Sequence, residues 1–423
     1  MRLTEISMGP VLDSLTVLCL FVEVALLLYL EKLSWKTIYT PLSFVMLPYT
    51  AVLVVTLLVA GSKFGFVEFY YPSIILWIVG IALFAIPSLT LGYVANKSGI
   101  QTVRPLENNE MPPIVLWIGL FCCVAFLYHL RQMSGSSAED FGSDSFGEEF
   151  SGGGIWGQLR QLTIPILIMS VYYADRTHWW LWLIVVLLVI VSLINQVKGW
   201  TIIPCLAGLA MRIYTGRLRV TLKLMAYVII GAFAVFFISY GLSILFVQKR
   251  GVSSEFMEFL FGHFFHYLTS GTLGLSMDME RGFPDAGGDF EMIIAQVVNL
   301  FRHFTGDGEM VNPLNPLYFN TGITLTNVRT LFGTLYINSN AIQFVLYILF
   351  LSTLMYMLKL AMARFSNIYV YTIYFFNCIL LFMSWFDLYF ASLIVFEMPV
   401  ITLLLWLCEW MLAPRHKSIE LSL

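Results

Sequence analysis

Charged residues are scarce in this chain of 423 residues. Asp, Glu, Lys and Arg together make up 12% of the sequence, and the formal net charge is −3. Soluble domains typically contain about twice that share of charged residues, and nucleic-acid-binding domains concentrate basic residues in one patch. Here the basic residues are scattered at the ends of apolar runs. This pattern excludes an ordinary soluble domain and a nucleic-acid partner.

Cysteine is also rare, and its placement does not suit cross-linking. All six cysteines fall inside apolar runs rather than in polar loops, at Cys19, Cys122, Cys123, Cys205, Cys378 and Cys408. Their spacing matches neither a disulfide framework nor a zinc site. They are interpreted as small apolar packing residues, and we expect neither a bound metal nor a cofactor.

What the sequence does contain is apolar surface: 59% of residues are hydrophobic, 16% are aromatic, and the mean hydropathy is +0.82. These values predict an all-α, polytopic membrane protein. A helix needs roughly 20 apolar residues to cross a hydrocarbon core of about 30 Å. By that measure the chain has eleven spans, at approximately 10–30, 40–61, 72–94, 112–130, 158–174, 179–196, 200–214, 221–247, 340–361, 367–386 and 388–411. The seventh contains Pro204 and Gly208 and is expected to be broken, tilted or re-entrant.

The distribution of Lys and Arg over the termini and short loops predicts the orientation. Thirteen basic residues lie on one side of the eleven spans and five on the other, and the richer side is cytoplasmic. The first apolar run has no cleavage pattern after it and is expected to be a retained span. The N-terminus is therefore predicted outside and the C-terminus in the cytoplasm. The chain divides into a membrane bundle at 1–247, a large outward loop at 248–339, and a second membrane part with a cytoplasmic tail at 340–423.

The outward loop contains two segments with amphipathic helical spacing. Residues 253–271 are predicted to form a helix that ends at Gly271 and has an apolar surface wide enough to lie in the membrane interface. Residues 289–306 are predicted to form a second helix, capped by Asp289 and ended by Gly306. We expect this second helix to pack over the bundle as a lid or platform.

Two sequence motifs in and near this loop carry a family resemblance. The first is HYLTSGTLGLSMDM, in which Tyr267 precedes a Gly-centred turn, and the second contains Thr326, Asn327, Thr330, Phe332 and Tyr336. Over roughly residues 195–362 the chain resembles the Wzy-type oligosaccharide repeat-unit polymerases of O-antigen and capsular polysaccharide synthesis. It departs from the family pattern after Tyr336, where Asn338 and Asn340 stand in place of an Asp followed by Gly. Asn can shape the same turn into a span.

The resemblance implies a metal-independent glycosyltransferase of the bacterial inner membrane. Such an enzyme moves a growing glycan from one undecaprenyl pyrophosphate to a sugar hydroxyl on the next lipid-linked repeat unit, at the outer face of that membrane. The implied partners are the lipid-linked glycan donor and acceptor and the lipid bilayer. A chain-length regulator and a flippase are further partners that the resemblance implies.

A pyrophosphate leaving group accumulates negative charge, which Arg side chains can stabilise through bidentate hydrogen bonds. Arg329 is the first candidate, because it lies within the resembling motif at the mouth of a span. We predict that Arg329→Ala abolishes chain extension while the protein remains folded in the membrane. The other candidates for substrate binding are Arg250, Arg281 and Arg302, Lys198 at the outer mouth of spans six and seven, and Asn327 and Tyr336 in the motif.

The acceptor hydroxyl must lose a proton as it attacks, and His or a carboxylate within hydrogen-bond reach can accept it. The outward loop offers His266, His303, Glu280 and Asp278 for this role. For each His, an interfacial side chain with a satisfied ring is the favoured alternative.

Two other functions fit the same features. One is a flippase for lipid-linked oligosaccharide or another secondary transporter, and the other is a ligase that joins finished glycan to an acceptor lipid. Transporters often contain internal repeats with matching broken helices, and the two halves of this chain show no such repeat. The carboxylates in or beside the spans also lack the Lys and Arg partners that a proton-coupled carrier would need; they are Asp13, Glu23, Asp387, Glu397 and Glu409. A ligase would also need cations near a pyrophosphate leaving group, so the residue types do not exclude this function.

The outward loop at 131–156 is rich in Gly, Ser and acidic residues. We interpret it as a flexible, solvated loop, because this composition cannot bury a core. Binding of a divalent cation by its carboxylates is the weaker alternative, since the EF-hand spacing is missing.

Overall fold

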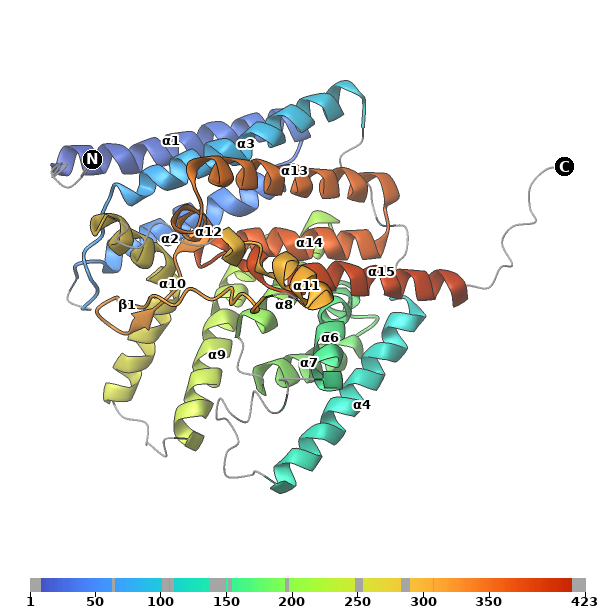
Figure 1. The fold of residues 1–423 in the computed structure, drawn as a ribbon. Coiled ribbons are helices and arrows are strands. Elements are labelled where there is room, and N and C mark those ends of the chain that lie inside the picture. Colours follow the sequence, from blue (N-terminus) through green and yellow to red (C-terminus); the bar gives the residue numbers. More distant parts are fainter. Residues whose placement is uncertain are drawn as a thin grey trace. The chain divides into compact units, whose positions relative to one another are not determined.

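A computed structural model of the protein describes residues 9–62, 65–100, 106, 110–136, 150, 154–194, 198–247, 254–282, 290–306 and 308–412. Most of these residues are helical, and one pair of two-residue strands is present (Figure 1). The predicted all-α, membrane-type fold is therefore confirmed. The helices form two compact units, and each unit combines segments that are far apart in the sequence.

The first unit comprises Met1–Arg104, Val252–Phe365 and Asn377–Val395. In it α3 packs against both α1 and α13, and α2 packs against α10 (Figure 1). Its elements are α1 (Pro10–Trp35), α2 (Pro41–Val59), α3 (Ser73–Lys97), α10 (Ser254–Glu280), η2 (Phe290–Met292), α11 (Ala295–Thr305), β1 (Phe319–Asn320), β2 (Leu325–Thr326), α12 (Thr330–Ile337), α13 (Ala341–Phe365), η3 (Met383–Trp385) and η4 (Tyr389–Ala391).

The second unit comprises Pro105–Gly251, Ser366–Phe376 and Phe396–Leu423. Within it α6 packs against both α7 and α8. Its helices are α4 (Pro113–Ser136), α6 (Gly154–Tyr173), α7 (Leu181–Ile194), α8 (Lys198–Tyr214) and α9 (Leu222–Val247). The remaining helices, α14 (Ile368–Phe382) and α15 (Ile394–Leu412), contribute residues to both units.

Seven helices in the described part of the chain are long and apolar enough to cross a membrane: α1, α2, α3, α4, α13, α14 extended by η3, and α15. Each coincides with a predicted span, and the multi-pass membrane protein is confirmed at this level. The four other predicted spans correspond to α6, α7, α8 and α9, of which the last three contain shorter apolar stretches. The number eleven therefore stays a prediction. The seventh predicted span is not broken, because α8 continues through Pro204.

A buried polar cluster ties three apolar helices of the first unit together. The Glu31 carboxylate on α1 is fully buried and accepts hydrogen bonds from the hydroxyls of Ser88 on α3 and Tyr356 on α13, the latter at 3.0 Å. The Lys359 ammonium, also fully buried, donates to the carbonyl of Tyr39 at 3.1 Å. Polar groups in an apolar interior must be hydrogen-bonded, so this cluster fixes how the helices pack.

The first helix of the outward loop is longer than predicted. It begins at Ser254 but continues through Gly271 to Glu280, and its residues from Thr269 to Asp278 are buried. Gly271 does not end the helix because its missing side chain serves packing instead: a Cβ there would lie 2.6 Å from the carbonyl oxygen of Trp385. The predicted helix end at Gly271 and the Gly-centred turn after Tyr267 are therefore wrong. The buried residues Thr269 to Gly271 also contradict the interfacial position expected for the end of the predicted helix.

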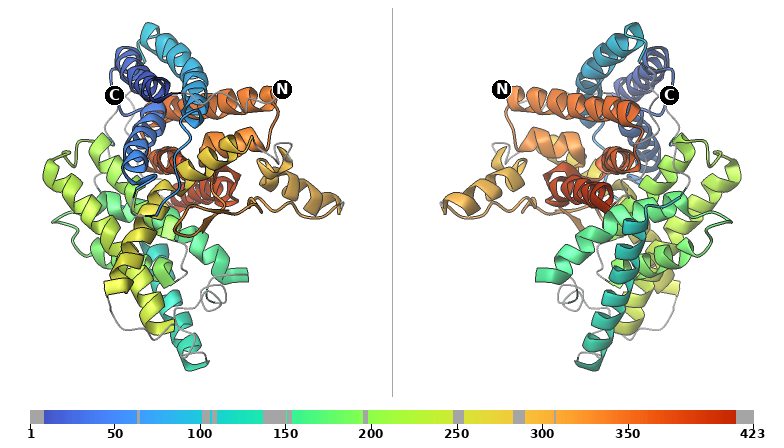
Figure 2. Two further views of the ribbon diagram at one scale, coloured as in Figure 1. Left: turned by 90° about the vertical axis from the view of Figure 1, so that its left-hand side faces the viewer. Right: turned by 90° about the vertical axis from the view of Figure 1, so that its right-hand side faces the viewer.

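The second loop helix is the shorter α11, which follows the single turn η2. Gly306 ends it as predicted, with φ of +72° and its N–H donating to the carbonyl of Arg302 at 2.8 Å, whereas the predicted cap Asp289 lies outside the described residues. The apolar face of α11 is exposed, up to 80% at Phe304, and the helix extends away from the other helices of its unit (gold in Figure 2). Within the first unit, the expected packing over the bundle is therefore wrong. An exposed amphipathic face is typical of a helix at a membrane surface.

Candidate functional site

A small β-hairpin directly precedes the central residues of the candidate site in the chain. Its strands β1 and β2 pair antiparallel, with Phe319 opposite Thr326. Gly322 in the turn has φ of +96°, and a Cβ there would collide with the carbonyl oxygen of Gly65. Only glycine meets both conditions, the positive φ and the close backbone approach. The hairpin is therefore docked on the segment between α2 and α3.

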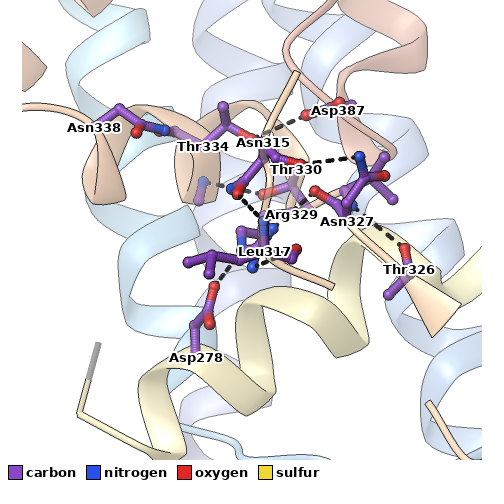
Figure 3. Close-up of polar contacts among 12 residues, drawn as sticks. Asp278, Asn315, Leu317, Thr326, Asn327, Arg329, Thr330, Thr334, Asn338 and Asp387 are labelled. Carbon is purple, nitrogen blue, oxygen red and sulfur yellow. Dashed lines mark hydrogen bonds and ion pairs between the residues drawn. The ribbon is translucent and has the colours of Figure 1, made fainter. Parts of the chain in front are cut away.

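Arg329 is the centre of the site, and it is fully buried. Its Nε donates to Oδ2 of Asp278 on α10, and its two terminal nitrogens donate to the carbonyls of Asn327 at 2.7 Å and Leu317 at 3.2 Å. Its guanidinium carbon also lies 4.4 Å from the centroid of the Phe319 ring. Figure 3 shows Asp278 pointing from α10 toward this guanidinium. One side chain thus joins α10, the hairpin and the first turn of α12.

These contacts assign Arg329 a positioning role in this structure. A buried charge is tolerated only when it is paired and its remaining donors are hydrogen-bonded, and Arg329 meets both conditions through groups of the protein itself. Its direct contact with a pyrophosphate stays a prediction.

Thr330 follows Arg329 in a strained conformation. Its φ is +68°, although the residue is β-branched and fully buried. Such a backbone costs about 1–3 kcal/mol and clusters at functional sites. Two contacts hold it: its N–H donates to the carbonyl of Phe386 at 3.1 Å, and its hydroxyl accepts from the N–H of Gly333 at 3.2 Å. The start of α12 is thereby fixed against the loop that contains Asp387.

A pocket of about 20 Å³ opens beside this loop. Its volume suits a single water molecule or hydroxyl group. The polar part of its lining comes from three separate segments, which contribute Asn315, Thr334, Asn338 and Asp387. The apolar part is formed by Met292, Ile293, Pro313, Leu388 and Ala391. Figure 3 places Asn338, Thr334 and Asp387 next to the Arg329 cluster.

The Asp387 carboxylate is held rigidly in the pocket wall. Its Oδ1 accepts from the hydroxyl of Thr334 at 2.9 Å and from the N–H of Leu388 at 2.8 Å. Burial raises the pKa of Asp387 above its ordinary value, although these two hydrogen bonds and the charge of Arg329 lower it. A carboxylate with a raised pKa is a better proton acceptor near neutral pH than an exposed one.

The predicted base His266 is buried in α10 under the hairpin. Its Nδ1 lies 2.9 Å from the hydroxyl oxygen of Thr321, and that hydroxyl donates to the carbonyl of Thr324. The imidazole therefore donates from Nδ1. Burial, with a smaller contribution from the charge of His263, lowers the pKa of His266 to about 4. The imidazole is therefore neutral at physiological pH, and its hydrogen bond to Thr321 holds the hairpin against α10.

We expect His266 to make stability depend on pH. Because its pKa is lower in the folded than in the unfolded chain, the unfolded state binds more protons between about pH 4 and 6.5, and stability is lost as pH falls through this range. The effect is up to about 3 kcal/mol. His266→Asn retains a donor for Thr321 and should flatten the dependence. The apparent melting temperature of both proteins in detergent, measured from pH 7.5 to 4.5, tests this; parallel curves would contradict it.

The remaining candidates on α10 and α12 are more exposed. Arg281, just after α10, has its guanidinium carbon 5.2 Å from the centroid of Phe319, the ring that Arg329 also contacts. Glu280 is exposed at the end of α10. Tyr336 is 42% exposed and its ring packs edge-on against that of Phe344, with 6.0 Å between centroids. The structure therefore brings Arg281 to the Arg329 cluster.

Arg302 and His303 lie apart from this cluster, on α11. The Arg302 guanidinium pairs with Glu291 at 2.6 Å and donates to the carbonyl of Glu309 at 2.6 Å, which folds the following loop back on the helix. His303 is exposed. Arg250 lies outside the described residues, and Lys198 is the first residue of α8 in the second unit.

Sequence reasoning missed most of the pocket. Asp387 was noted only as a charge at an outer turn, and Asn338 only as a departure from the family pattern. Asn315 and Thr334 were not singled out. These residues give only a weak signal in the sequence, because the three segments that supply the polar lining are separated along the chain.

Comparisons with known proteins identify the family of the chain but no characterised relative. A family described as "Family of unknown function (DUF6337)" matches residues 65–413. No curated protein and no solved structure matches the chain. The described part of the chain contains no group of three or more His, Cys, Asp or Glu side chains that could hold a metal ion.

Proposed function

We propose that the chain, which belongs to the family of unknown function DUF6337, is a membrane glycosyltransferase that polymerises lipid-linked oligosaccharide repeat units. The observation that carries this proposal is the buried ion pair between Arg329 and Asp278. Asp278 belongs to the motif that begins near Tyr267, and Arg329 belongs to the motif with Asn327 and Tyr336. The two segments that resemble polymerase motifs therefore meet in one site.

The proposed reaction transfers a glycan between two lipid carriers. The hydroxyl of an acceptor sugar attacks the anomeric carbon of the donor glycan, and the bond from that carbon to the pyrophosphate breaks. The electron pair leaves with the undecaprenyl pyrophosphate, and the hydroxyl proton passes to a base. The protein must therefore place a cation near the leaving group and a base near the hydroxyl.

Arg281 is the predicted cation that best suits the leaving group. It is exposed at the end of α10 and shares the Phe319 ring with Arg329. In this scheme Arg329 fixes the Phe319 ring and the segment around it, while Arg281 binds the pyrophosphate. Arg302 is tethered to Glu291, which makes it the weaker candidate. Arg250 and Lys198 stay in the proposal as further candidates for binding the carrier pyrophosphate.

The proposal places the site at the outer face of the bacterial inner membrane, with the N-terminus outside and the C-terminus in the cytoplasm. It rests on the excess of Lys and Arg in the loops of the other side. The segments of the site all come from the predicted outward loop and from the turn between α14 and α15, which the same orientation also places outside.

Deleting the gene in its native host tests the function directly. We expect the long surface glycan to disappear from gels and lipid with a single repeat unit to remain at the surface, because synthesis and transport of the unit would continue without polymerisation. Complementation with the intact chain should restore the ladder.

The alternatives give different intermediates in the same experiment. Repeat units trapped on the cytoplasmic face would point to a flippase, and long chains left on their carrier outside would point to a ligase. An unchanged glycan would contradict all three functions.

A further inference from the structure

We infer that Asp387 is the general base that accepts the proton of the acceptor sugar hydroxyl, and that the pocket of Asn315, Thr334 and Asn338 binds that hydroxyl. This inference rests on the proposed glycan transfer and deepens it. It replaces the bases expected from the sequence. His266 is buried in a structural contact, Asp278 is paired with Arg329, His303 lies apart on α11, and Glu280 is exposed to solvent.

The pocket has the size and chemistry of a hydroxyl site. Its volume of about 20 Å³ admits one hydroxyl group but excludes the sugar ring. The acceptor ring would stay outside and hold its hydroxyl at the mouth of the pocket, where the oxygen faces the anomeric carbon of the donor. The acceptor would therefore be recognised through one protruding hydroxyl.

The polar groups of the lining complement a hydroxyl, which both donates and accepts. Asn338 uses its Nδ2 to donate to the carbonyl of Thr334 at 3.0 Å, and Asn315 uses its Oδ1 to accept from the N–H of Leu317 at 3.0 Å. Among the described residues, these bonds occupy one half of each amide. The other halves, an acceptor on Asn338 and a donor on Asn315, suit a hydroxyl in the pocket.

Asp387 is oriented for proton transfer by the two hydrogen bonds to its Oδ1. Both bonds use the same oxygen, so the carboxylate is fixed in rotation, and the described residues form no such bond to Oδ2. The nearby Arg329 charge stabilises the anion from the protein side, without neutralising it in a direct ion pair. The carboxylate thus stays a proton acceptor while burial keeps it basic.

The step balances without any further reactant. The acceptor O–H bond breaks and its proton moves to Oδ2 of Asp387, while the oxygen forms a new bond to the anomeric carbon. The carbon–oxygen bond to the donor pyrophosphate breaks, and its electron pair leaves with the pyrophosphate. The protonated Asp387 then returns its proton to solvent or to the departing pyrophosphate.

The test measures glycan polymerisation in membranes from the deletion strain, supplied with lipid-linked repeat units and complemented by variants at matched protein levels. Asp387→Asn keeps the shape and an acceptor for Thr334 but cannot take a proton, and we expect it to lower the maximal rate at least about 100-fold. Asp387→Glu should recover part of that rate. Thr334→Val, which removes the hydrogen bond and leaves the carboxylate, should lower the rate by no more than about tenfold.

Ser384→Ala is the matched control, because this buried residue lies three positions before Asp387 but is not part of the pocket lining. It should polymerise at the normal rate. Equal losses in Asp387→Asn and Thr334→Val would make Asp387 a structural residue and overturn the inference. A normal rate in Asp387→Asn would overturn it too, while the function stands if the deletion strain lacks the ladder. If deletion leaves the ladder intact, the proposed function itself fails.

Discussion

Replacing Arg329 with methionine is expected to destabilise the first unit by about 3–5 kcal/mol and to abolish glycan extension. The substitution removes a fully buried cation and deprives the Asp278 carboxylate, 6% exposed, of the positive charge that Arg329 supplies. An uncompensated buried charge is the main cost of breaking such a pair. The burial revises the sequence-based expectation for Arg329→Ala, in which extension is lost and the fold is kept. The apparent melting temperature and the surface glycan of the variant measure both effects.

The double variant Arg329→Met with Asp278→Leu separates charge from packing. Because it removes both charges of the buried pair, it should be more stable than Arg329→Met alone. Arg281→Met is the control, since Arg281 contacts the same Phe319 ring from an exposed position and should change the melting temperature little. If Arg329→Met melts like the wild type, the buried pair does not hold the site together.

Gly271→Val is expected to cost at least about 3 kcal/mol, at the upper end of the range for overpacking. A Cβ at this position would collide with the carbonyl oxygens of Trp385 and Phe386, which are backbone atoms and cannot rotate away. The Phe386 carbonyl also accepts from the N–H of Thr330, and the next residue is Asp387. The variant should therefore lose both its stability and the geometry of the pocket.

Gly262→Ala on the same helix is the matched control. A Cβ there would meet the side chain of Ile323 at 3.6 Å, which is an ordinary contact. Alanine also has a higher helix propensity than glycine by about 1 kcal/mol. We expect the melting temperature of Gly262→Ala to equal or exceed that of the wild type. Similar losses in both variants would mean that α10 tolerates no added side chain anywhere, and that the contact with the Phe386 carbonyl is not special.

Prediction of the helices succeeded where it relied on long apolar runs. The runs that became α1, α2, α3, α4, α13, α14 and α15 are long enough to cross a membrane by themselves. It failed where a helix end depended on tertiary contacts. Gly271 is a common stop signal in a sequence, but in α10 it lets the backbone of another segment approach.

Prediction of the candidate site also succeeded for single segments and failed where tertiary contacts decide. The sequence singled out Arg329 and Asn327 because their motif resembles one of the polymerases, and Asp278 because it is a carboxylate in the same outward loop. It could not pair Arg329 with Asp278, since they are 51 positions apart. Nor could it give Asp387 a role, because the Asp387 partner Thr334 is 53 positions away.

The sequence by itself determined that this is a helical membrane protein, because the hydrophobicity and length of a helix are properties of a single segment. Only the tertiary structure decided which polar groups are buried, which are paired and which line a pocket. Burial and pairing depend on side chains brought together from distant segments. For this reason only the structure could assign Arg329 a positioning role inside the protein and identify Asp387 as a candidate base.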